Sequence, residues 1–218
     1  MKRILLIAGG VVLTAVLVLV IIVVQFTKAS EVISEGTPIP DYQEEKSAVM
    51  VIDIQECTTG KYSREHSYQN QSSGLFFRVN AVIEEAKSRS IPIIYIKNEI
   101  THPIINFLDN SMQKGSPGAE LDRGLVIASN NIFSKDKLDA FSNPALDEFL
   151  QQEKISKLYV TGLDVAYCVK STVEAALNRK YEIVLVEDAI ISESNELKNR
   201  ALKELKTLGC KTILAEEF

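Results

Sequence analysis

The sequence contains no tryptophan, two histidines and three cysteines among its 218 residues. It also has no basic stripe, since 24 Lys and Arg residues stand against 29 Asp and Glu residues, for a formal net charge of -5 at pH 7. Proteins that bind nucleic acid usually gather cations on one face and place aromatic rings where bases can stack. The composition therefore predicts no nucleic-acid partner.

The sequence also lacks the common patterns for binding metal ions or phosphate groups. His66 and His102 are far apart in the sequence and have no ligand spacing around them. The ten glycines form no phosphate-binding loop pattern. We therefore expect no metal and no other cofactor, and the sequence gives no basis for the Cys–His pair of a cysteine protease.

The three cysteines, Cys57, Cys168 and Cys210, do not form a disulfide framework, because an odd number leaves at least one thiol unpaired. A Cys57–Cys210 bridge is compatible with an exported domain. Burial of both side chains as small apolar residues is the simpler alternative. The distance that decides between the two is not contained in the sequence.

A long apolar run without charge covers residues 4–24. About 20 apolar residues in a helix span the hydrocarbon core of a bilayer, so we expect residues 1–28 to form a single N-terminal membrane anchor. A cleaved signal peptide is the alternative. Its apolar core is usually shorter and is followed by small residues, whereas residues 25–28 read QFTK here.

Charges beside the run predict its orientation. Lys2 and Arg3 precede it, and only Lys28 follows closely. Cytoplasmic flanks carry the excess of cations. We therefore expect the N-terminus in the cytoplasm and the following domain outside it.

The rest of the chain divides into a tether, residues 29–46, and a single domain, residues 47–218. The tether contains Ser, Glu, Gly, Thr and two prolines without an apolar period. In the domain, apolar runs rich in branched residues alternate with segments of helical period. We predict strands at 48–54, 92–96, 126–132 (weak), 157–161, 182–187 and 211–214, and helices at 75–90, 144–153, 168–179 and 193–208.

This alternation predicts an α/β fold, in which a mostly parallel, Rossmann-like sheet lies between two layers of helices in a three-layer αβα arrangement. Residues 101–126 have few regular signals and carry two prolines and three glycines. A long irregular stretch in a compact domain is often functional, so we expect it to form a lid or a pocket wall.

Two reactive side chains come where predicted strands end, and ligands bind at the carboxyl ends of parallel strands. Asp53 closes the first strand and has the chemistry to accept a thiol proton and return it to a leaving amine. Cys168 opens a helix, whose free N–H groups and dipole favour a thiolate and stabilise an oxyanion. Each also has an ordinary interpretation: Asp53 as a turn cap and Cys168 as a core residue. Lys135 stands among polar neighbours and is by itself an ordinary surface lysine.

Four motifs in one order give these residues a common meaning: VIDIQ at 51–55, GSPGAEL at 115–121, a K-x-x-x-x-A-F pattern at 135–141, and TGLDVAYCVKSTVEAAL at 161–177. With them the chain resembles the isochorismatase-like cysteine hydrolase family, which includes nicotinamidases and other amidohydrolases. The resemblance covers residues 47–218 and excludes the anchor and the tether.

The resemblance implies an Asp–Lys–Cys triad formed by Asp53, Lys135 and Cys168. Cys168 is then the nucleophile and Asp53 the proton shuttle, while Lys135 stabilises the thiolate and keeps Asp53 ionised. The family also has a cis peptide before the cysteine, which matches Leu163–Asp164 here. It would direct the N–H of Asp164, together with that of Cys168, at the oxyanion.

The chain departs from the family pattern at three places. Asp164 replaces a residue that is often small, so its carboxylate would repel an anionic substrate or recognise an amine. Cys57 and Thr58 stand where many members have an aromatic residue, which implies an altered pocket wall. The region of the nicotinamidase metal ligands offers only His102, with Glu99 and Asp109 nearby, and this disfavours a metal-dependent nicotinamidase. Tyr167, which directly precedes Cys168, resembles the nicotinamidases, so this subgroup stays as a minority hypothesis.

The leading hypothesis is therefore a membrane-anchored hydrolase that cleaves a C–N bond of a small amide through an acyl-enzyme on Cys168. A catalytically silent, tethered binding or scaffold domain is the alternative from another class. Hydrolysis of an enol ether is a third reading, although it does not obviously need a thiol. We expect a small-molecule substrate, and the resemblance implies dimers or larger homo-oligomers.

Overall fold

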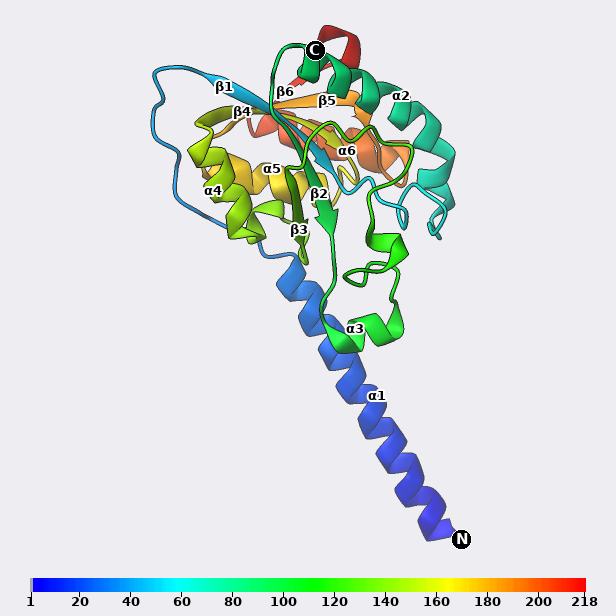
Figure 1. Cartoon of the computed structure of the whole chain (residues 1–218). Coiled ribbons are helices and arrows are strands. Elements are labelled where there is room, and N and C mark those ends of the chain that lie inside the picture. Colours follow the sequence, from blue (N-terminus) through cyan, green and yellow to red (C-terminus); the bar gives the residue numbers. More distant parts are fainter. Residues whose placement is uncertain (1) are drawn as a thin grey trace.

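The computed structural model describes residues 2–218, with side chains from Gly9 onward. Helix α1 (Lys2–Ser30) projects away from a domain in which helices surround a central sheet (Figure 1). This arrangement confirms the predicted fold class, a three-layer αβα domain that follows a single N-terminal apolar helix.

In the described residues, six strands form one parallel sheet in the order β3-β2-β1-β4-β5-β6. They are β1 (Lys46–Ile52), β2 (Ile93–Asn98), β3 (Ile132–Lys135), β4 (Ile155–Gly162), β5 (Glu182–Ile190) and β6 (Lys211–Ile213). The chain builds outward from β1 to β3 and then returns to add β4 on the other side of β1. Such a reversal leaves a crevice at the carboxyl ends of the two central strands, where ligands bind in open α/β sheets.

Helices cover both faces of this sheet. Helices α4 (Pro144–Gln152), α5 (Cys168–Asn178) and α6 (Asn195–Thr207) contribute to the core on one face, and α2 (His66–Ser88) to the core on the other. Successive residues of a strand point to opposite faces, so Met50 enters the first core and Val51 the second. Burial on both sides explains why β1 is a nearly continuous apolar run.

Most predicted elements lie close to their expected bounds, but two predictions were wrong. Helix α2 begins at His66 instead of residue 75, because its polar first turns lack the apolar period that marks the rest. The strand predicted at 126–132 is instead β3, which starts at Ile132. The hydroxyl of Tyr95 holds the preceding residues as a loop, since it donates to the carbonyl of Val126 and accepts from the amide of Ala128, both at 2.9 Å.

The stretch 101–126, expected to be irregular, contains one short helix, α3 (Pro103–Leu108), and a single 3-10 turn at Pro117–Ala119. Helix α3 begins at the cap residue His102, whose Nδ1 accepts from the amide of Ile105. In Figure 1 it lies beside the part of α1 nearest the domain.

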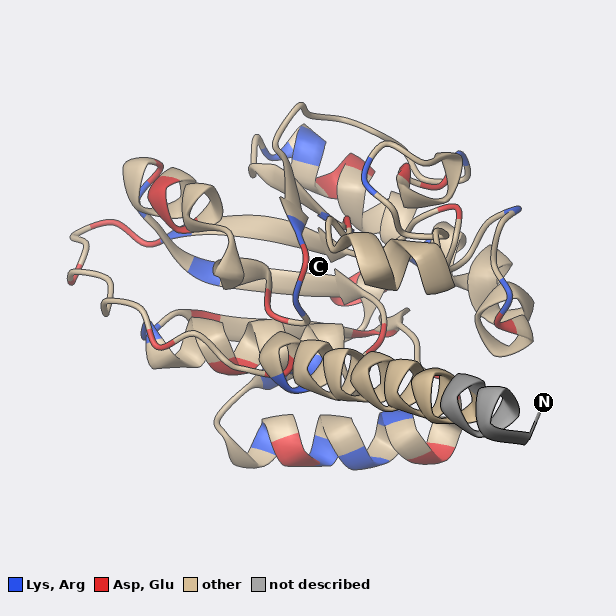
Figure 2. Cartoon of the chain, turned by 90° about the horizontal axis from the view of Figure 1, so that it is seen from below, with Lys and Arg blue, Asp and Glu red and all other residues tan. Residues whose placement is uncertain are grey.

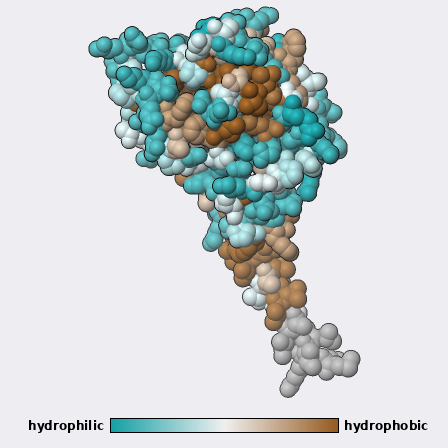
Figure 3. Space-filling model, viewed as in Figure 1, coloured by the Kyte–Doolittle hydropathy of each residue, from teal (hydrophilic) through white to brown (hydrophobic). Residues whose placement is uncertain are grey.

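The part of α1 from Gly9 to Ser30 is long enough to cross a membrane, and a stretch of 18 residues within it has a mean hydropathy of 2.7. None of its residues is buried in the protein. Figure 3 shows the described part of this helix as a hydrophobic stem below a domain whose visible face is hydrophilic around a hydrophobic patch in its upper middle. The length and the exposure together give a helix suited to a membrane.

The segment after α1, predicted as a tether, contacts the domain over part of its length. The backbone N–H of Ser34 donates to the buried carboxylate of Asp139 (2.9 Å), and Arg179 donates to the carbonyl of Ser34 (3.1 Å). The amide of Ile39 in turn donates to the carbonyl of Arg179 (2.8 Å). Residues 34–39 therefore lie fixed against the domain.

Gly162, at the end of β4, packs closely against β1. Its φ is +110°, and a Cβ atom at this position would lie 2.1 Å from the carbonyl oxygen of Ile52. Both the positive φ and the close approach to β1 therefore require glycine at this position. We expect Gly162→Ala to lower the free energy of unfolding by more than about 1 kcal/mol, measured by denaturant unfolding.

Gly209→Ala is the matched control, because Gly209 has φ +99° and no atom within 4 Å of its Cβ position. It carries the cost of the backbone conformation without the clash. Equal losses in the two variants would contradict the close approach of β4 to β1.

Candidate active site

Asp53 lies directly after β1, at the carboxyl edge of the sheet. Its φ is +53°, a left-handed conformation that aspartate adopts more readily than most residues. The amide of Asp53 donates to the carbonyl of Ile96 (3.0 Å), and the hydroxyl of Thr58 donates to its carbonyl (2.7 Å). These bonds hold the backbone in place and fix the carboxylate at the crevice beside β4.

Lys135 is the last residue of β3, and its side chain is completely buried. Its Nζ donates to Oδ2 of Asp53 at 2.8 Å and to the carbonyl of Lys137 at 3.0 Å. The third contact of Nζ is Sγ of Cys168, at 3.3 Å. The ammonium therefore has a partner for each of its three hydrogens.

Cys168 is the first residue of α5 and is also buried. It thus stands at a helix N-terminus, as the sequence predicted. The structure brings the three predicted residues together, although Asp53 and Lys135 are 82 positions apart in the chain and Lys135 and Cys168 are 33 apart.

The electrostatics of this group differ from our expectation. Burial raises the pKa of the Cys168 thiol, the Asp53 carboxylate raises it further, and Lys135 only partly opposes them, so that this pKa is about 12. Burial acts to lower the pKa of Lys135, but the neighbouring Asp53 and Cys168 outweigh it and raise the pKa. The single cation in this buried site, Lys135, balances one anion, and the carboxylate of Asp53 already takes that place. In the resting site, burial and the neighbouring Asp53 thus act against the thiolate that we expected from the helix N-terminus and Lys135.

The second carboxylate oxygen of Asp53, Oδ1, is buried and has no hydrogen-bond partner among the described residues. A buried polar atom without a partner is uncommon in a folded protein. The thiol of Cys168 is close enough to feel the charge of Asp53 strongly. Oδ1 is thus the oxygen available to accept a proton at this site.

Two backbone N–H groups beside the thiol are also free. Within residues 2–218, neither the amide of Asp164 nor that of Cys168 donates a hydrogen bond. The Leu163–Asp164 peptide bond is cis, as the resemblance implied. Free N–H groups next to a nucleophile are the kind of donor that stabilises an oxyanion.

The carboxylate of Asp164, by contrast, is fully engaged inside the protein. Oδ1 accepts from the Ser192 hydroxyl and the Ala166 amide, both at 2.6 Å. Oδ2 accepts from the Tyr68 hydroxyl and the Glu193 amide, both at 2.9 Å. With four donors around it, this side chain holds the neighbouring loops together. The expectation that it would face a substrate is not met.

Cys57 and Cys210 are both buried, and neither forms a disulfide. Burial raises the pKa of both thiols, with the charge of Asp53 adding to the effect at Cys57: to about 12 for Cys57 and about 11 for Cys210. Both are therefore protonated at neutral pH. Of the two alternatives for Cys57 and Cys210, a disulfide or burial without pairing, the structure has the second.

Gln55 is a positioning residue to which our sequence reasoning gave no role, although it is part of the VIDIQ motif. Its side-chain Nε2 donates to the carbonyls of Asn98 (3.0 Å) and Ala119 (2.7 Å), and its Oε1 accepts from the amide of Asn98 (2.7 Å). These bonds join the loop after β1 to the end of β2 and to the 3-10 turn. A buried glutamine that satisfies three backbone groups fixes the backbone around Asp53.

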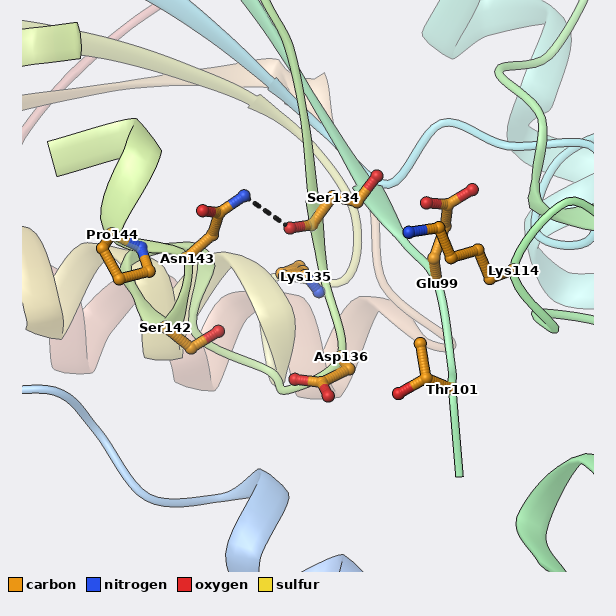
Figure 4. A pocket seen from close by; sticks show the side chains of 9 residues that line it. All are labelled: Glu99, Thr101, Lys114, Ser134, Lys135, Asp136, Ser142, Asn143 and Pro144. Carbon is orange, nitrogen blue, oxygen red and sulfur yellow. Dashed lines mark hydrogen bonds between the residues drawn. The ribbon is translucent and has the colours of Figure 1, made fainter. Parts of the chain in front are cut away.

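A cavity of about 280 Å³ opens beside Lys135 (Figure 4). Its lining is mostly polar and comes from the ends of β2 and β3 and the start of α4: Glu99, Thr101, Lys114, Ser134, Lys135, Asp136, Ser142, Asn143 and Pro144. Asp53 and Cys168 are not in this lining. The cavity is therefore next to the three-residue group but is not a pocket in which a bound carbonyl would face Sγ.

The residues considered as metal ligands have other partners. His102 caps α3, Glu99 pairs with Lys97 (3.3 Å), and Asp109 accepts from the amide of Ser111 (2.9 Å). In the described part of the chain, no group of three or more His, Cys, Asp or Glu side chains is arranged to hold a metal ion.

The domain is similar to known proteins in sequence and in fold. The sequence profile of the isochorismatase domain matches residues 47–217. A probable inactive nicotinamidase of Arabidopsis thaliana is 26% identical over 188 residues, which cover 79% of this chain and 94% of that protein. The chain also spans most of the length of the solved structures that it resembles.

An isochorismatase-like hydrolase from Alkaliphilus metalliredigens superposes with a TM-score of 0.69 at 22% identity and covers 79% of this chain and 96% of its own. An N-carbamoylsarcosine amidase from Thermoplasma acidophilum gives a TM-score of 0.67 at 24% identity, with 79% and 98% covered. At these identities the two structures show a shared fold.

Proposed function

The chain belongs to the isochorismatase-like hydrolase family, and on this premise we propose that it is a cysteine hydrolase that cleaves the C–N bond of a small amide. The observation that carries the proposal is the buried group of three side chains, in which Lys135 contacts Oδ2 of Asp53 at 2.8 Å and Sγ of Cys168 at 3.3 Å. A base, a cation and a nucleophile within contact distance are the parts that nucleophilic acyl transfer needs.

The first half-reaction forms a thioester. As Sγ of Cys168 bonds to the amide carbon, the thiol proton passes to Asp53, and the carbonyl oxygen becomes an oxyanion held by the N–H groups of Asp164 and Cys168. Lys135 offsets the negative charge while the proton is in transit. The C–N bond then breaks, and Asp53 gives the proton to the departing nitrogen, so that ammonia or an amine leaves.

The second half-reaction uses water. Asp53 takes a proton from a water molecule while the oxygen of that water bonds to the thioester carbon. The C–S bond then breaks and releases the carboxylic acid. The proton returns to Sγ, and the resting thiol is restored. Because burial and the charge of Asp53 disfavour a resting thiolate, Asp53 acts as the base in each half.

We propose further that α1 anchors this enzyme in a membrane. The support is its apolar length, Gly9–Ser30, and the exposure of its side chains. Two cations, Lys2 and Arg3, precede the span and one, Lys28, lies at its other end. The positive-inside rule then favours a cytoplasmic N-terminus and an extracytoplasmic catalytic domain.

A silent binding domain is the second candidate, and one observation favours it: the Arabidopsis thaliana relative is a probable inactive nicotinamidase. Against it stands the presence of Asp53, Lys135 and Cys168 together in contact. Loss of any one of them would be expected in a domain that no longer needs proton transfer.

The proposal is tested by incubating the purified full chain with a panel of small primary amides, aromatic carboxamides, N-carbamoyl compounds and an enol ether. We expect release of ammonia from at least one class, and loss of that release after alkylation of Cys168. Turnover of an enol ether that survives alkylation, with no amide cleaved, would replace the proposal by the enol-ether reaction. No turnover of any of these would favour the binding domain.

A further inference from the structure

Helix α3 presents large apolar side chains to its surroundings. The side chain of Phe107 is 88% exposed and that of Leu108 is 49% exposed. The helix reads PIINFL and contains no charged residue. An exposed cluster of this kind marks a contact with a partner or a membrane.

The position of α3 relative to α1 identifies what it contacts. The rings of His102, which caps α3, and Phe26 of α1 meet edge to face with centroids 5.6 Å apart. In α1, Ile22, Val23 and Phe26 lie on one side of the helix and are only half exposed. Figure 1 shows α3 beside α1, below the sheet.

The depth of this contact is set by the length of α1. Phe26 precedes Ser30, the end of the candidate membrane span, by four residues, which is about 6 Å along a helix axis. Interfacial helices bury their apolar faces about 5–10 Å into the boundary between headgroups and acyl chains. If α1 spans a membrane, α3 therefore lies at the level of this boundary.

The charge around the domain is consistent with apolar insertion and not with attraction to anionic lipid. Seen from below in Figure 2, Lys and Arg are interspersed with Asp and Glu and are not gathered in one patch. A soluble protein that covered Phe107 would itself have to enter the headgroup layer beside α1. The membrane is the occupant that the position of α3 favours.

We propose that α3 is a second membrane contact, in which Phe107 and Leu108 enter the interfacial layer of the membrane that holds α1. The inference rests on the anchoring proposed above for α1, but not on the hydrolase activity. Helix α3 follows β2 closely, and the carboxyl ends of β2 and β3 point toward α1 (Figure 1). The contact therefore holds the edge of the sheet that carries Lys135 near the membrane surface.

The absence of tryptophan makes a direct test available, because each single Trp variant has one emitter. The full chain is reconstituted into phosphatidylcholine vesicles that carry a nitroxide quencher near either the headgroup end or the middle of the acyl chain. The variants are Phe107→Trp in α3, Leu17→Trp within the apolar span, and Phe77→Trp in α2. Phe77 is the matched control, since it is an exposed phenylalanine (73%) on a helix that covers the sheet.

We expect the emission of Phe107→Trp to be blue-shifted and quenched about twofold or more by the shallow nitroxide, that of Leu17→Trp to be quenched most by the deep one, and that of Phe77→Trp to be unaffected. Quenching of Leu17→Trp without quenching of Phe107→Trp would overturn the inference and leave the anchor intact. A blue shift of Phe107→Trp without lipid quenching would assign α3 to a protein partner, such as a second copy. If Leu17→Trp is not quenched, the anchor and the inference are both wrong.

Discussion

Replacement of Cys168 by alanine is expected to lower amide hydrolysis by at least about a thousandfold, because it removes the only atom of the protein that bonds to the substrate carbon in the proposed mechanism. The fold should survive, since the change removes one sulfur from the first residue of a helix. The measurement is the rate of ammonia release at saturating amide, with circular dichroism as the check on folding.

Cys57→Ala and Cys210→Ala are the matched controls, because they make the same substitution at the two other buried cysteines. Each should keep the activity within about threefold of the original chain, apart from a modest loss of stability from the small cavity. Equal losses in all three variants would indicate a structural effect of removing a buried thiol. Unchanged hydrolysis in Cys168→Ala would exclude this residue as the nucleophile.

Replacement of Lys135 by methionine should have the largest effect on stability. Its side chain is completely buried and neutralises a carboxylate that is buried with it. Methionine fills the space but leaves the charge of Asp53 without a partner, and breaking a buried pair in this way costs about 3–5 kcal/mol. The free energy of unfolding from urea denaturation measures the loss.

Lys157→Met is the control for an exposed pair, because Lys157 lies 3.4 Å from both Glu45 and Glu182 near the surface. Its loss should stay below about 1 kcal/mol. Asp53→Asn should cost less than Lys135→Met, since Cys168 can then ionise beside the lysine. The double variant Asp53→Asn/Lys135→Met should lose less than the sum of the single losses. Strict additivity would contradict a direct interaction between the two charges.

Much of the fold was predictable because burial leaves a clear mark in the sequence. The strand β1 is apolar on both faces, and the predicted start of α5 at Cys168 is the one that the structure has. The elements that were not predicted correctly are those whose structure depends on contacts with neighbouring residues and not on an apolar period in the sequence. The first turns of α2 are polar, and β3 has only four residues paired to one edge of the sheet.

The membership of the site was likewise predictable, because Asp53 and Cys168 follow parallel strands and such residues meet at one edge. The ordered motifs added Lys135, which no local pattern distinguishes from a surface lysine. Charge states were not predictable in this way. The helix N-terminus and Lys135 favour a thiolate when considered alone, but the sequence does not reveal that all three groups are buried together, and it is burial that raises the pKa of the thiol.

The side chain of Asp164 shows the same limit. Its carboxylate next to the cysteine suggested a role in substrate recognition, whereas four donors from distant parts of the chain enclose it: the side chains of Tyr68 and Ser192 and the amides of Ala166 and Glu193. These partners come together only in the folded chain. A position beside a nucleophile therefore does not predict which way a side chain faces.

The most direct measurement of the central claim, that Asp53 holds Cys168 as a neutral thiol and serves as its base, is the rate of Cys168 alkylation as a function of pH. Peptide mass spectrometry separates Cys168 from Cys57 and Cys210, and no substrate is needed. In the original chain the pKa of Cys168 is about 12, so we expect slow alkylation at pH 7 that still rises at the highest accessible pH. Asp53→Asn removes an anion that raises this pKa, so its profile should shift to lower pH and its thiol should react faster, even though hydrolysis is lost. A profile in Asp53→Asn that is unchanged or shifted to higher pH would contradict the account.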